Sequence, residues 1–486
     1  MQMSFRDPGG QTCIFDKRVL RIVNSDGLHE LTAFLRCPVF EEFVESNQLV
    51  NSSVLDADAT GELLVQPSVR DLYQECEGVS IVEHERVEFQ SFPYEWSPEM
   101  LHAAATLTLD LAESLFEEGW GLKDASPYNV LFRGPNPIFV DLLSFERRNL
   151  YDPTWTPLAQ FTRTFLLPLL VNKYFGIDLA QQLTTHRDGI EPDVVYRLAG
   201  PLQKCLSPFL SMVSVPTWLT SARPENIRSI YRKHAYKDLK KAAFVFRRVL
   251  KSARRHLDAL APSSQRASRW SDYAEESNYS PRYQAIKRDL ILDIFGTHKP
   301  KRVLDIGCNT GVFSVLAAQF GAKVIAIDSD PIVVGKLWRR AATEKLDILP
   351  LVVDVTRPSA SIGWRNRECP SFLDRARDEF DLVLMLGIIH HLLVTERIPL
   401  SQIIELAAEL TKNLLVIEFV APDDQMFGCI TRGREDLHRE LTRNAFDKAC
   451  SVHFEVLDCK RLDQTSRWLY LMRKKETLIE CLETQQ

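Results

Sequence analysis

The sequence predicts an α/β protein, and three observations lead to that prediction. From about Trp270 to about Lys475, strand-like and helical segments alternate, which is typical of a parallel sheet covered by helices. Acidic or polar residues end several of these strands, where open α/β sheets bind ligands. The chain has 486 residues, too many for one ordinary core, so a second domain is expected ahead of this one.

Composition and charge narrow the class of protein. Hydrophobic residues make up 45% and charged residues 26% of the chain, as in folded soluble proteins. No apolar run is long enough to cross a bilayer, and the N-terminus lacks signal-peptide features, so we expect a cytoplasmic protein without a transmembrane segment. A net charge of −6 does not indicate nucleic acid as a partner. The 10 cysteines show no CxxC pair or zinc spacing, so we expect reduced thiols and no metal site.

Residues 1–225 are expected to form an α+β domain. Ser97 and Pro98 open a long helical pattern with proline in the first turn, and Gly119 and Gly121 close it. Two short β-rich pieces, VLF and IFVDL, come after this helix. The segment therefore combines a long helix with short strands.

Residues 226–269 are expected to form a basic helical linker. Basic and apolar residues alternate here at roughly helical spacing, and a Pro/Ser-rich break ends the segment. Such a helix suits contact with an anionic membrane surface or a phosphate group through residues 228–256. The simpler interpretation is a solvated helix that packs one domain on the other.

Residues 270–480 contain the motif on which most of the functional prediction depends. A buried strand, KRVLDI, is followed at once by the turn GCNTG and the apolar helix VFSVLAAQF, as a nucleotide-binding βα unit requires. Gly307 and Gly311 are expected in the turn because a Cβ would keep the backbone from approaching the ligand. Asp305 ends the strand, where it can anchor the turn or the charged amino-acid portion of a ligand. Asn309 takes a place where glycine is common, and asparagine tolerates unusual backbone angles.

Further strands follow in order, and each ends in or near a polar group. AKVIAID ends at Asp328, 23 residues after Asp305, about the distance at which such units place a carboxylate on ribose hydroxyls. ILPLVVDV leads to Asp354, EFDLVLML runs into residues 387–391 (GIIHH), and NLLVIEFV ends near Glu418. Two more β-like runs, HFEVLDC and RWLYLMR, come last.

This run of motifs resembles the class I S-adenosylmethionine-dependent methyltransferases. The resemblance implies a Rossmann-like seven-stranded domain, closed by HFEVLDC and RWLYLMR as antiparallel strands, with S-adenosylmethionine as the cofactor. By position, the methionine moiety would lie against Asp305 and the glycine turn, the ribose on Asp328, and the adenine against Asp354. The residues implied for the cofactor are Asp305, Gly307, Cys308, Asn309, Gly311, Asp328, Asp354, Val355 and Leu386.

Two alternatives stay open for these residues. Glycine turns also occur in dinucleotide dehydrogenases, although DIGCNTG lacks the third glycine of G-x-G-x-x-G. Asp354 is alternatively a solvated acid at the end of a strand.

His390 and His391, at the mouth of the fourth strand, are the candidate catalytic residues. Methyl transfer needs mainly alignment of the reacting atoms, with removal of a proton if the acceptor is an alcohol. An imidazole titrates near neutral pH, so either histidine suits that role, and either is alternatively a hydrogen-bonded lining residue. Enzymes that methylate amino groups of nucleic acids resemble one another in an Asn/Asp-Pro-Pro-aromatic motif here. This chain has GIIHH instead, which disfavours DNA or RNA bases as acceptors.

The stretch WSDYAEESNYSPRYQAIKRD precedes the glycine-turn motif. It contains Trp270, Tyr273, Tyr279 and Lys287. These residues belong either to a lid that closes over the cofactor and excludes water or to a packed surface helix.

The run KDASPYNVLF, followed by FVDLLSF, resembles the catalytic loop and metal-binding strand of the protein-kinase-like superfamily, particularly its small-molecule phosphotransferases. By position, Asp124 would be the base for a hydroxyl acceptor, and Asn129 and Asp141 would hold magnesium against the phosphates of ATP. The chain departs from the family pattern, because it has no glycine-rich phosphate loop, no clear lysine-bearing strand and no Asp-Phe-Gly. An active Mg-ATP site, a degenerate relative that binds a substrate or partner, and a chance match all stay open.

The layout as a whole resembles bacterial nodulation proteins of the NoeA type, which implies decoration of a lipo-oligosaccharide or another glycan. We therefore expect a methyltransferase that acts on a hydroxyl-bearing small molecule or glycan, with His390 or His391 as the base. The rival interpretations are a bifunctional kinase and methyltransferase, a protein methyltransferase, and a cofactor-binding scaffold without turnover.

Overall fold

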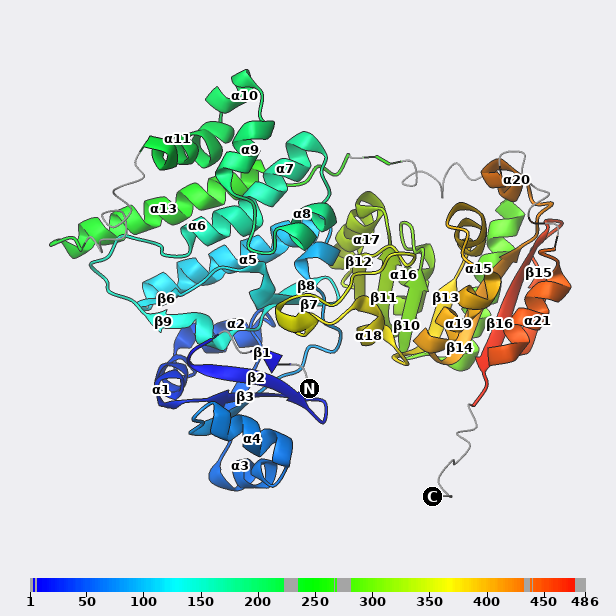
Figure 1. Cartoon of the computed structure of the whole chain (residues 1–486), viewed down its shortest axis with the longest axis horizontal. Coiled ribbons are helices and arrows are strands. Elements are labelled where there is room, and N and C mark those ends of the chain that lie inside the picture. The colour runs from blue at the N-terminus through cyan, green and yellow to red at the C-terminus, as the bar shows by residue number, and fades with distance from the viewer. Residues whose placement is uncertain are drawn as a thin grey trace. The chain divides into compact units, whose positions relative to one another are not determined.

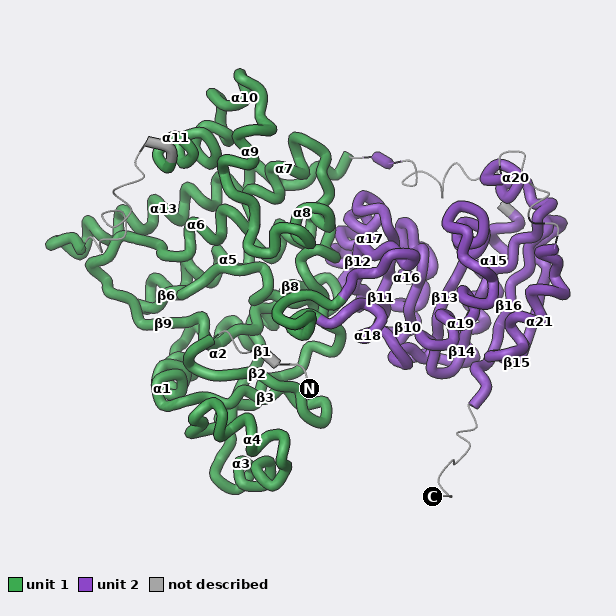
Figure 2. Tube along the Cα trace, in the orientation of Figure 1, with its two compact units in different colours: residues 1–265, 361–369 green, residues 266–360, 370–486 purple. Residues whose placement is uncertain are grey.

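The chain divides into two compact units, which Figure 2 colours separately. Unit 1 comprises Met1–Gln265 and Ser361–Cys369, and unit 2 comprises Arg266–Ala360 and Pro370–Gln486. The boundary at Gln265 falls inside the segment predicted as a linker. The computed structural model describes residues 3–4, 7–222, 235–265, 267–268, 281–431, 438 and 440–476.

Unit 1 begins with a five-stranded antiparallel sheet in the order β1-β2-β3-β5-β4, of which Figure 1 labels β1, β2 and β3. Leu20 and Ile22 of β3 and Ile81 of β5 are completely buried, so the sheet has one apolar face. Helices α3 and α4 pack beside each other after β4. The elements of this part are β1 (Met3–Ser4), β2 (Gly10–Phe15), β3 (Arg18–Val23), α1 (Ser25–Phe34), α2 (Pro38–Glu45), β4 (Ser52–Val54), α3 (Ala57–Leu64), α4 (Pro67–Glu75) and β5 (Ser80–His84).

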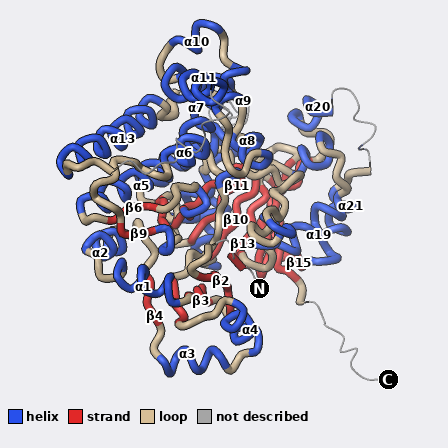
Figure 3. Tube along the Cα trace, turned by 60° about the vertical axis from the view of Figure 1, so that its left-hand side comes forward, coloured by secondary structure: helices blue, strands red, loops and turns tan. Residues whose placement is uncertain are grey.

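The rest of unit 1 is mostly helical (Figure 3). Its long helix α5 starts with Ser97 as N-cap and Pro98 in the first turn, and the chain leaves it at Gly119 with φ of +75°, as the sequence pattern predicts. Two short antiparallel strand pairs follow, β6 with β9 and β7 with β8. The elements are α5 (Pro98–Glu117), β6 (Trp120–Leu122), β7 (Val130–Arg133), β8 (Asn136–Phe139), β9 (Phe145–Arg147), α6 (Leu158–Phe161), α7 (Leu167–Phe175), α8 (Leu179–Thr185), α9 (Pro192–Leu198), α10 (Pro201–Cys205), α11 (Val215–Ala222) and α13 (Leu239–Ala259).

The basic helix α13 packs on α5 within unit 1. Phe246 on its buried face stacks on Phe116 with ring centroids 4.5 Å apart. Arg254 forms an ion pair of 2.6 Å with Asp110 of α5. The apolar face of this amphipathic helix is therefore covered by its own unit.

Unit 2 is built on a seven-stranded sheet in the order β12-β11-β10-β13-β14-β16-β15 (Figure 1). Strands β10 to β14 are parallel, whereas β16 runs antiparallel to both β14 and β15. Every strand predicted from the sequence in this region is present, and the last two are the predicted antiparallel pair. The strands are β10 (Arg302–Ile306), β11 (Lys323–Asp328), β12 (Ile348–Val352), β13 (Phe380–Met385), β14 (Thr411–Val420), β15 (Phe454–Arg461) and β16 (Arg467–Lys474).

Helices cover this sheet, and its parallel strands are buried. Residues of β10, β13 and β14 are almost continuously apolar and inaccessible, as expected for strands covered on both faces. Because parallel strands end at the same edge, the residues that follow β10, β11, β12 and β13 meet there. The helices are α15 (Pro281–His298), α16 (Val312–Gln319), α17 (Pro331–Glu344), α18 (Phe372–Ala376), α19 (Leu400–Leu410), α20 (Gln425–Thr431) and α21 (Arg443–His453). In the described part of the chain, no helix has the length and apolar character needed to cross a membrane.

Candidate active site

The turn after β10 has the backbone that its glycines predict. Gly307, Asn309 and Gly311 all have positive φ, at 74°, 50° and 78°. A Cβ on Gly307 would lie 2.8 Å from the side chain of Ile388, and one on Gly311 would lie 2.3 Å from that of Leu337. Glycine is therefore required both by the left-handed backbone and by close protein neighbours, in addition to the predicted approach of a ligand.

Two carboxylates hold this turn in place. Asp328, at the end of β11, accepts hydrogen bonds from the backbone N–H of Asn309 at 2.9 Å and of Asp330 at 3.0 Å. Asp305, which is 2% exposed, accepts a hydrogen bond of 2.6 Å from the hydroxyl of Ser314 on α16. Burial raises the pKa of Asp305 to about 6. Both acids thus lie beside the turn, where the sequence places them.

The other residues predicted for the cofactor follow the ends of neighbouring strands. Asp354 accepts hydrogen bonds from the backbone N–H and the hydroxyl of Thr356, at 2.9 Å and 2.6 Å, and its side chain is 37% exposed. Val355 and Cys308 are buried and Leu386 is half-buried. Asp354 therefore caps a turn in this structure, and its contact with adenine stays a prediction.

His390 is buried, and none of the described residues forms a hydrogen bond with its ring. The residue is 1% exposed, and in the described part of the chain neither ring nitrogen finds a donor or acceptor. It follows β13 and precedes a π-helical turn at His391–Thr395, a distortion often found at functional sites. Burial, together with His391 and Arg467, lowers the pKa of His390 to about 3, so its ring is neutral at physiological pH. A buried polar group without a partner is costly, which indicates that a ligand completes its hydrogen bonding.

A buried ionic cluster lies near this histidine. Glu418 of β14, which is completely buried, accepts hydrogen bonds from Lys287 at 2.6 Å, from the hydroxyl of Tyr283 at 2.6 Å and from Arg467 at 3.0 Å. Arg467 also binds both carboxylate oxygens of Asp424, at 2.9 Å and 3.0 Å. Burial alone would raise the pKa of Glu418, but the ion pairs with Lys287 and Arg467 outweigh it and hold the value at about 2.

Sequence reasoning located only part of this arrangement. It placed Glu418 at a strand end but did not find its hydrogen bonds with Tyr283 and Arg467. The available signal was an arginine that opens the otherwise apolar run RWLYLMR. We call the set Lys287, Asp305, His390, Glu418 and Arg467 the strand-tip site.

The stretch proposed as a lid is only partly described. Lys287 lies on α15, where its ammonium group pairs with Glu418. Trp270, Tyr273 and Tyr279 lie outside the described residues. A lid and a packed surface helix therefore both stay open as predictions for those three residues.

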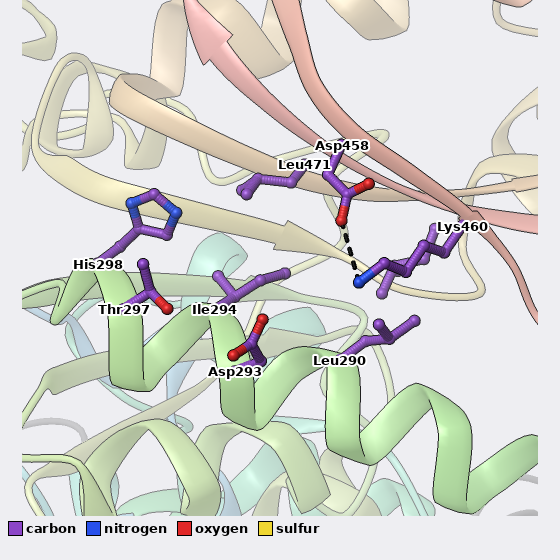
Figure 4. Close-up of a pocket in the computed structure, with 9 residues that line it drawn as sticks. Leu290, Asp293, Ile294, Thr297, His298, Asp458, Lys460 and Leu471 are labelled. Carbon is purple, nitrogen blue, oxygen red and sulfur yellow. Dashed lines mark ion pairs between the residues drawn. The ribbon is translucent and has the colours of Figure 1, made fainter.

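A cavity of about 80 Å³ lies elsewhere in unit 2 (Figure 4). The C-terminal half of α15 and the β15–β16 hairpin line it, and Lys460 forms an ion pair of 3.2 Å with Asp458 at its side. Pockets for cofactors are typically several hundred Å³, roughly 300–1,000 Å³. This cavity is too small for a nucleoside. Its lining residues are Leu290, Asp293, Ile294, Thr297, His298, Asp458, Lys460, Leu469 and Leu471.

In unit 1, the three residues predicted for a kinase-like site come together. The amide nitrogen of Asn129 donates to Asp124 at 3.0 Å. The hydroxyl of Ser144 lies 2.6 Å from Asp124 and 2.7 Å from Asp141. The guanidinium group of Arg21 forms an ion pair of 2.7 Å with Asp141. We call these five residues the unit 1 cluster.

Arg21 brings a positive charge to the carboxylate that was predicted to bind magnesium. It lies on β3 and is 7% exposed, and the sequence pattern did not predict it, because the kinase-like family carries a lysine on such a strand. Burial would raise the pKa of Asp141, but Arg21 and Ser144 outweigh it and lower that pKa. Both oxygens of Asp141 and one of Asp124 are already engaged. Magnesium needs several free oxygen ligands, so Mg-ATP does not fit the cluster as it stands.

Comparison with known proteins identifies the family. Residues 279–464 match the family described as methyltransferase domain. The chain is 30% identical to nodulation protein NoeA of Rhizobium meliloti (strain 1021) over 474 residues, which cover 97% of this chain and 96% of the relative. A stretch of 90 residues is 33% identical to ubiquinone biosynthesis O-methyltransferase of Yersinia enterocolitica, covering 18% of this chain and 37% of that enzyme.

Solved structures with a similar fold include an N-methyltransferase. The N-methyltransferase NodS from Bradyrhizobium japonicum, in complex with S-adenosyl-l-homocysteine, is 13% identical and covers 43% of this chain and 100% of its own, with a TM-score of 0.31. At that score the likeness carries no argument. The family match over residues 279–464 and the observed sheet order together make unit 2 a Rossmann-like, S-adenosylmethionine-dependent methyltransferase domain. The dehydrogenase alternative is therefore set aside.

Proposed function

We propose that this chain, which belongs to the family of the nodulation protein NoeA, transfers a methyl group from S-adenosylmethionine to a hydroxyl group of a small molecule or glycan. The observation that carries the proposal is the neutral, buried ring of His390, whose two nitrogens lack partners among the described residues. A hydroxyl group both donates and accepts hydrogen bonds, so it matches the one N–H and the one lone pair of a neutral imidazole.

In the proposed mechanism, residues at the strand ends bind the donor and His390 receives the proton of the acceptor. The donor supplies a methyl group on a positively charged sulfur. Asp305 and the glycine turn orient the amino-acid end of the donor, and Asp328 holds its ribose. The acceptor oxygen forms its new bond to the methyl carbon as the carbon–sulfur bond breaks. With a pKa of about 3, His390 is too weak a base to deprotonate the hydroxyl group beforehand, so it takes the proton as the oxygen becomes positively charged and then releases it to water.

Three observations support a glycan or small-molecule acceptor over nucleic acid. The relative that matches almost the whole chain is named for nodulation, which suits a lipo-oligosaccharide acceptor. The net charge of −6 gives no general attraction to phosphate backbones. The segment after β13 reads GIIHH rather than the motif of base-methylating enzymes.

A labelling experiment tests the acceptor. Purified full-length protein is incubated with methyl-labelled S-adenosylmethionine and fractionated bacterial extract. We expect label in the glycan or lipid fraction, lost in His390→Ala and retained in His298→Ala, a control histidine on α15. Label in protein or RNA alone would overturn the acceptor assignment. Donor binding without transfer to any fraction would favour a non-catalytic scaffold.

A second proposal concerns unit 1. We propose that it is a degenerate kinase-like domain that binds a substrate or partner, because Arg21 already neutralises Asp141. Calorimetry with Mg-ATP tests this, and no heat of binding is expected for the intact chain. Binding that disappears in Asp141→Ala would instead establish a bifunctional kinase and methyltransferase.

Contact of residues 228–256 with an anionic membrane or a phosphate group stays a proposal. Residues 228–234 lie outside the described residues, and the apolar face of α13 is covered by α5. Lys240, Lys241 and Lys251 are exposed, so any such contact through α13 is electrostatic and does not insert the helix into lipid.

A further inference from the structure

Two neighbouring helices of unit 1, α10 and α11, present large apolar side chains to solvent. Leu202 and Leu206 are exposed one turn apart on α10, and Leu202 is 81% exposed. Val215, Trp218 and Leu219 are exposed within one turn of α11, and Leu219 is 66% exposed. Residues three or four apart share a helix face, so each helix has an outward apolar face. Grouped apolar residues of this kind mark interaction sites, whereas single ones do not.

The two apolar faces belong to one group of packed helices. The π-helical turn Leu210–Ser214 packs against α9, α10 and α11. Figures 1 and 3 both show α10 and α11 next to each other at the top of the view. Tyr196 of α9 also meets Trp218 of α11, with ring centroids 6.5 Å apart. The apolar faces are therefore parts of one surface, the α10–α11 surface, which comprises Leu202, Leu206, Val215, Trp218 and Leu219.

Aromatic rings and a lysine accompany this surface. The indole N–H of Trp218 donates to the hydroxyl of Tyr196 at 3.2 Å, and the ammonium group of Lys204 lies 4.1 Å from the ring centroid of Tyr196. Trp and Tyr are enriched where lipid tails meet headgroups, because each ring has an apolar body and a polar edge. From Leu198 to Ala222 the sequence has one lysine and no acidic residue. This stretch therefore carries no charge that an anionic headgroup would repel.

Helix α13 adds exposed cations without counter-charges. Arg248, Lys251 and Arg255 are exposed and recur at helical spacing on the side opposite the buried Phe246. None of these three forms an ion pair with a described residue, whereas Arg254 pairs with acids of α5. Their charges are therefore available to an anionic partner.

Helix α13 lies directly beside the helices that carry the apolar faces. The hydroxyl of Ser211, in the π-helical turn, lies 3.0 Å from Nε2 of His256 on α13. His256 follows Arg255 immediately in the chain. The exposed cations and the α10–α11 surface are thus neighbours within unit 1.

We propose that the α10–α11 surface docks unit 1 on an anionic membrane, with its apolar side chains between the lipid headgroups and the cations of α13 on those headgroups. The proposal extends the contact of residues 228–256 named under Proposed function, and it supplies the apolar anchor that α13 lacks. Stable membrane binding generally needs two such signals together. A second copy of this chain fits less well, because the stretch from Leu198 to Ala222 offers no acidic residue to pair with the cations.

Co-sedimentation of the full chain with vesicles tests the proposal. We expect binding to phosphatidylcholine vesicles that contain phosphatidylglycerol, and weaker binding to phosphatidylcholine alone. Leu202→Ser combined with Leu219→Ser should weaken binding by about tenfold or more, because burial of one leucine side chain is worth about that factor. Arg248→Gln combined with Lys251→Gln should weaken binding to the anionic vesicles by about 25-fold, roughly fivefold for each charge.

A matched control separates the surface from apolar exposure in general. Val65→Ser combined with Val79→Ser changes two exposed residues elsewhere in unit 1 and should leave vesicle binding unchanged. Thermal unfolding of each variant verifies that it folds.

Three results would overturn the proposal. The first is an intact chain that sediments with neither kind of vesicle. The second is a leucine variant that binds as tightly as the intact chain, which would leave an electrostatic contact of α13 alone. The third is a dimer of the intact chain that the leucine substitutions dissociate, without vesicle binding. Vesicle binding by a chain that transfers no methyl group would support the docking surface and refute only the function proposed above.

Discussion

The strand-tip site of unit 2 and the unit 1 cluster are built from similar side chains but differ in what they leave open. In unit 1, Ser144, Asn129 and Arg21 engage both predicted carboxylates, and the buried atom of this cluster without a described partner is a donor, the Nε of Arg21. In unit 2, His390 is buried without a partner in the described residues, and Lys287 keeps two donors free of described partners.

This difference shows that a motif and a site are not the same thing. Both regions carry acids at the spacing expected of an enzyme family. The hydrogen bonds that a buried group lacks indicate a binding site better than the residue types that are present, because native proteins satisfy almost all buried polar groups. Among the described residues, His390 leaves both a donor and an acceptor without partners, so the comparison favours proton transfer in unit 2. Four experiments test this conclusion.

The largest expected effect is on catalysis. His390→Asn should lower kcat for the labelled acceptor by about 100-fold or more, the usual contribution of a positioned base, while Asp124→Asn should leave kcat unchanged. Steady-state rates with labelled donor measure both variants. A comparable loss in Asp124→Asn would mean that the unit 1 cluster takes part in the same reaction.

The next effect is on stability. Glu418→Gln leaves two buried cations with one counter-charge fewer, so the free energy of unfolding should fall by about 3–5 kcal/mol. Asp141→Asn should cost roughly half as much, because Asp141 pairs with one buried cation, Arg21, whereas Glu418 pairs with two. Hydrogen exchange, monitored during a denaturant titration, measures the free energy of unfolding of each unit separately, because two units need not unfold together. Equal losses would contradict this ranking.

Donor affinity should depend on pH. Burial raises the pKa of Asp305 to about 6, so the empty site takes up a proton there as the pH falls. Protonation removes the charge that receives the amino group of the donor, and the dissociation constant should be about tenfold higher at pH 5 than at pH 7. Calorimetry across this range measures it, with Asp305→Asn as a control that binds weakly at every pH. Asp141 of unit 1 should show no such transition, since its pKa is lowered.

The smallest effect concerns an exposed ion pair. Arg254 of α13 pairs with Asp110 and Glu113 on α5, whose side chains are 40% and 45% exposed. Arg254→Ala should destabilise unit 1 by about 1 kcal/mol or less, and less still in high salt, because solvent screens surface charges. Thermal unfolding at low and high salt provides the measurement. A loss as large as that of Glu418→Gln would contradict the contrast between buried and exposed pairs.

The amino-acid sequence was sufficient to predict the architecture of unit 2 and the location of the glycine turn after β10. Strand periodicity, the glycines at 307 and 311, and the acids at 305 and 328 depend on near neighbours along the chain. Their backbone requirements hold in almost any tertiary setting, because a left-handed turn needs glycine or asparagine wherever it occurs.

Which charged groups form pairs depends on the tertiary structure. Lys287 and Glu418 are separated by 131 residues, and their contact follows from where α15 crosses the sheet. Arg21 meets Asp141 because the sheet of unit 1 packs near the loop after β8. No local sequence pattern marks these two ion pairs, and none marks the ring of His390 that lacks described hydrogen-bond partners. The partner of a buried charge depends on strand order and on the exclusion of water.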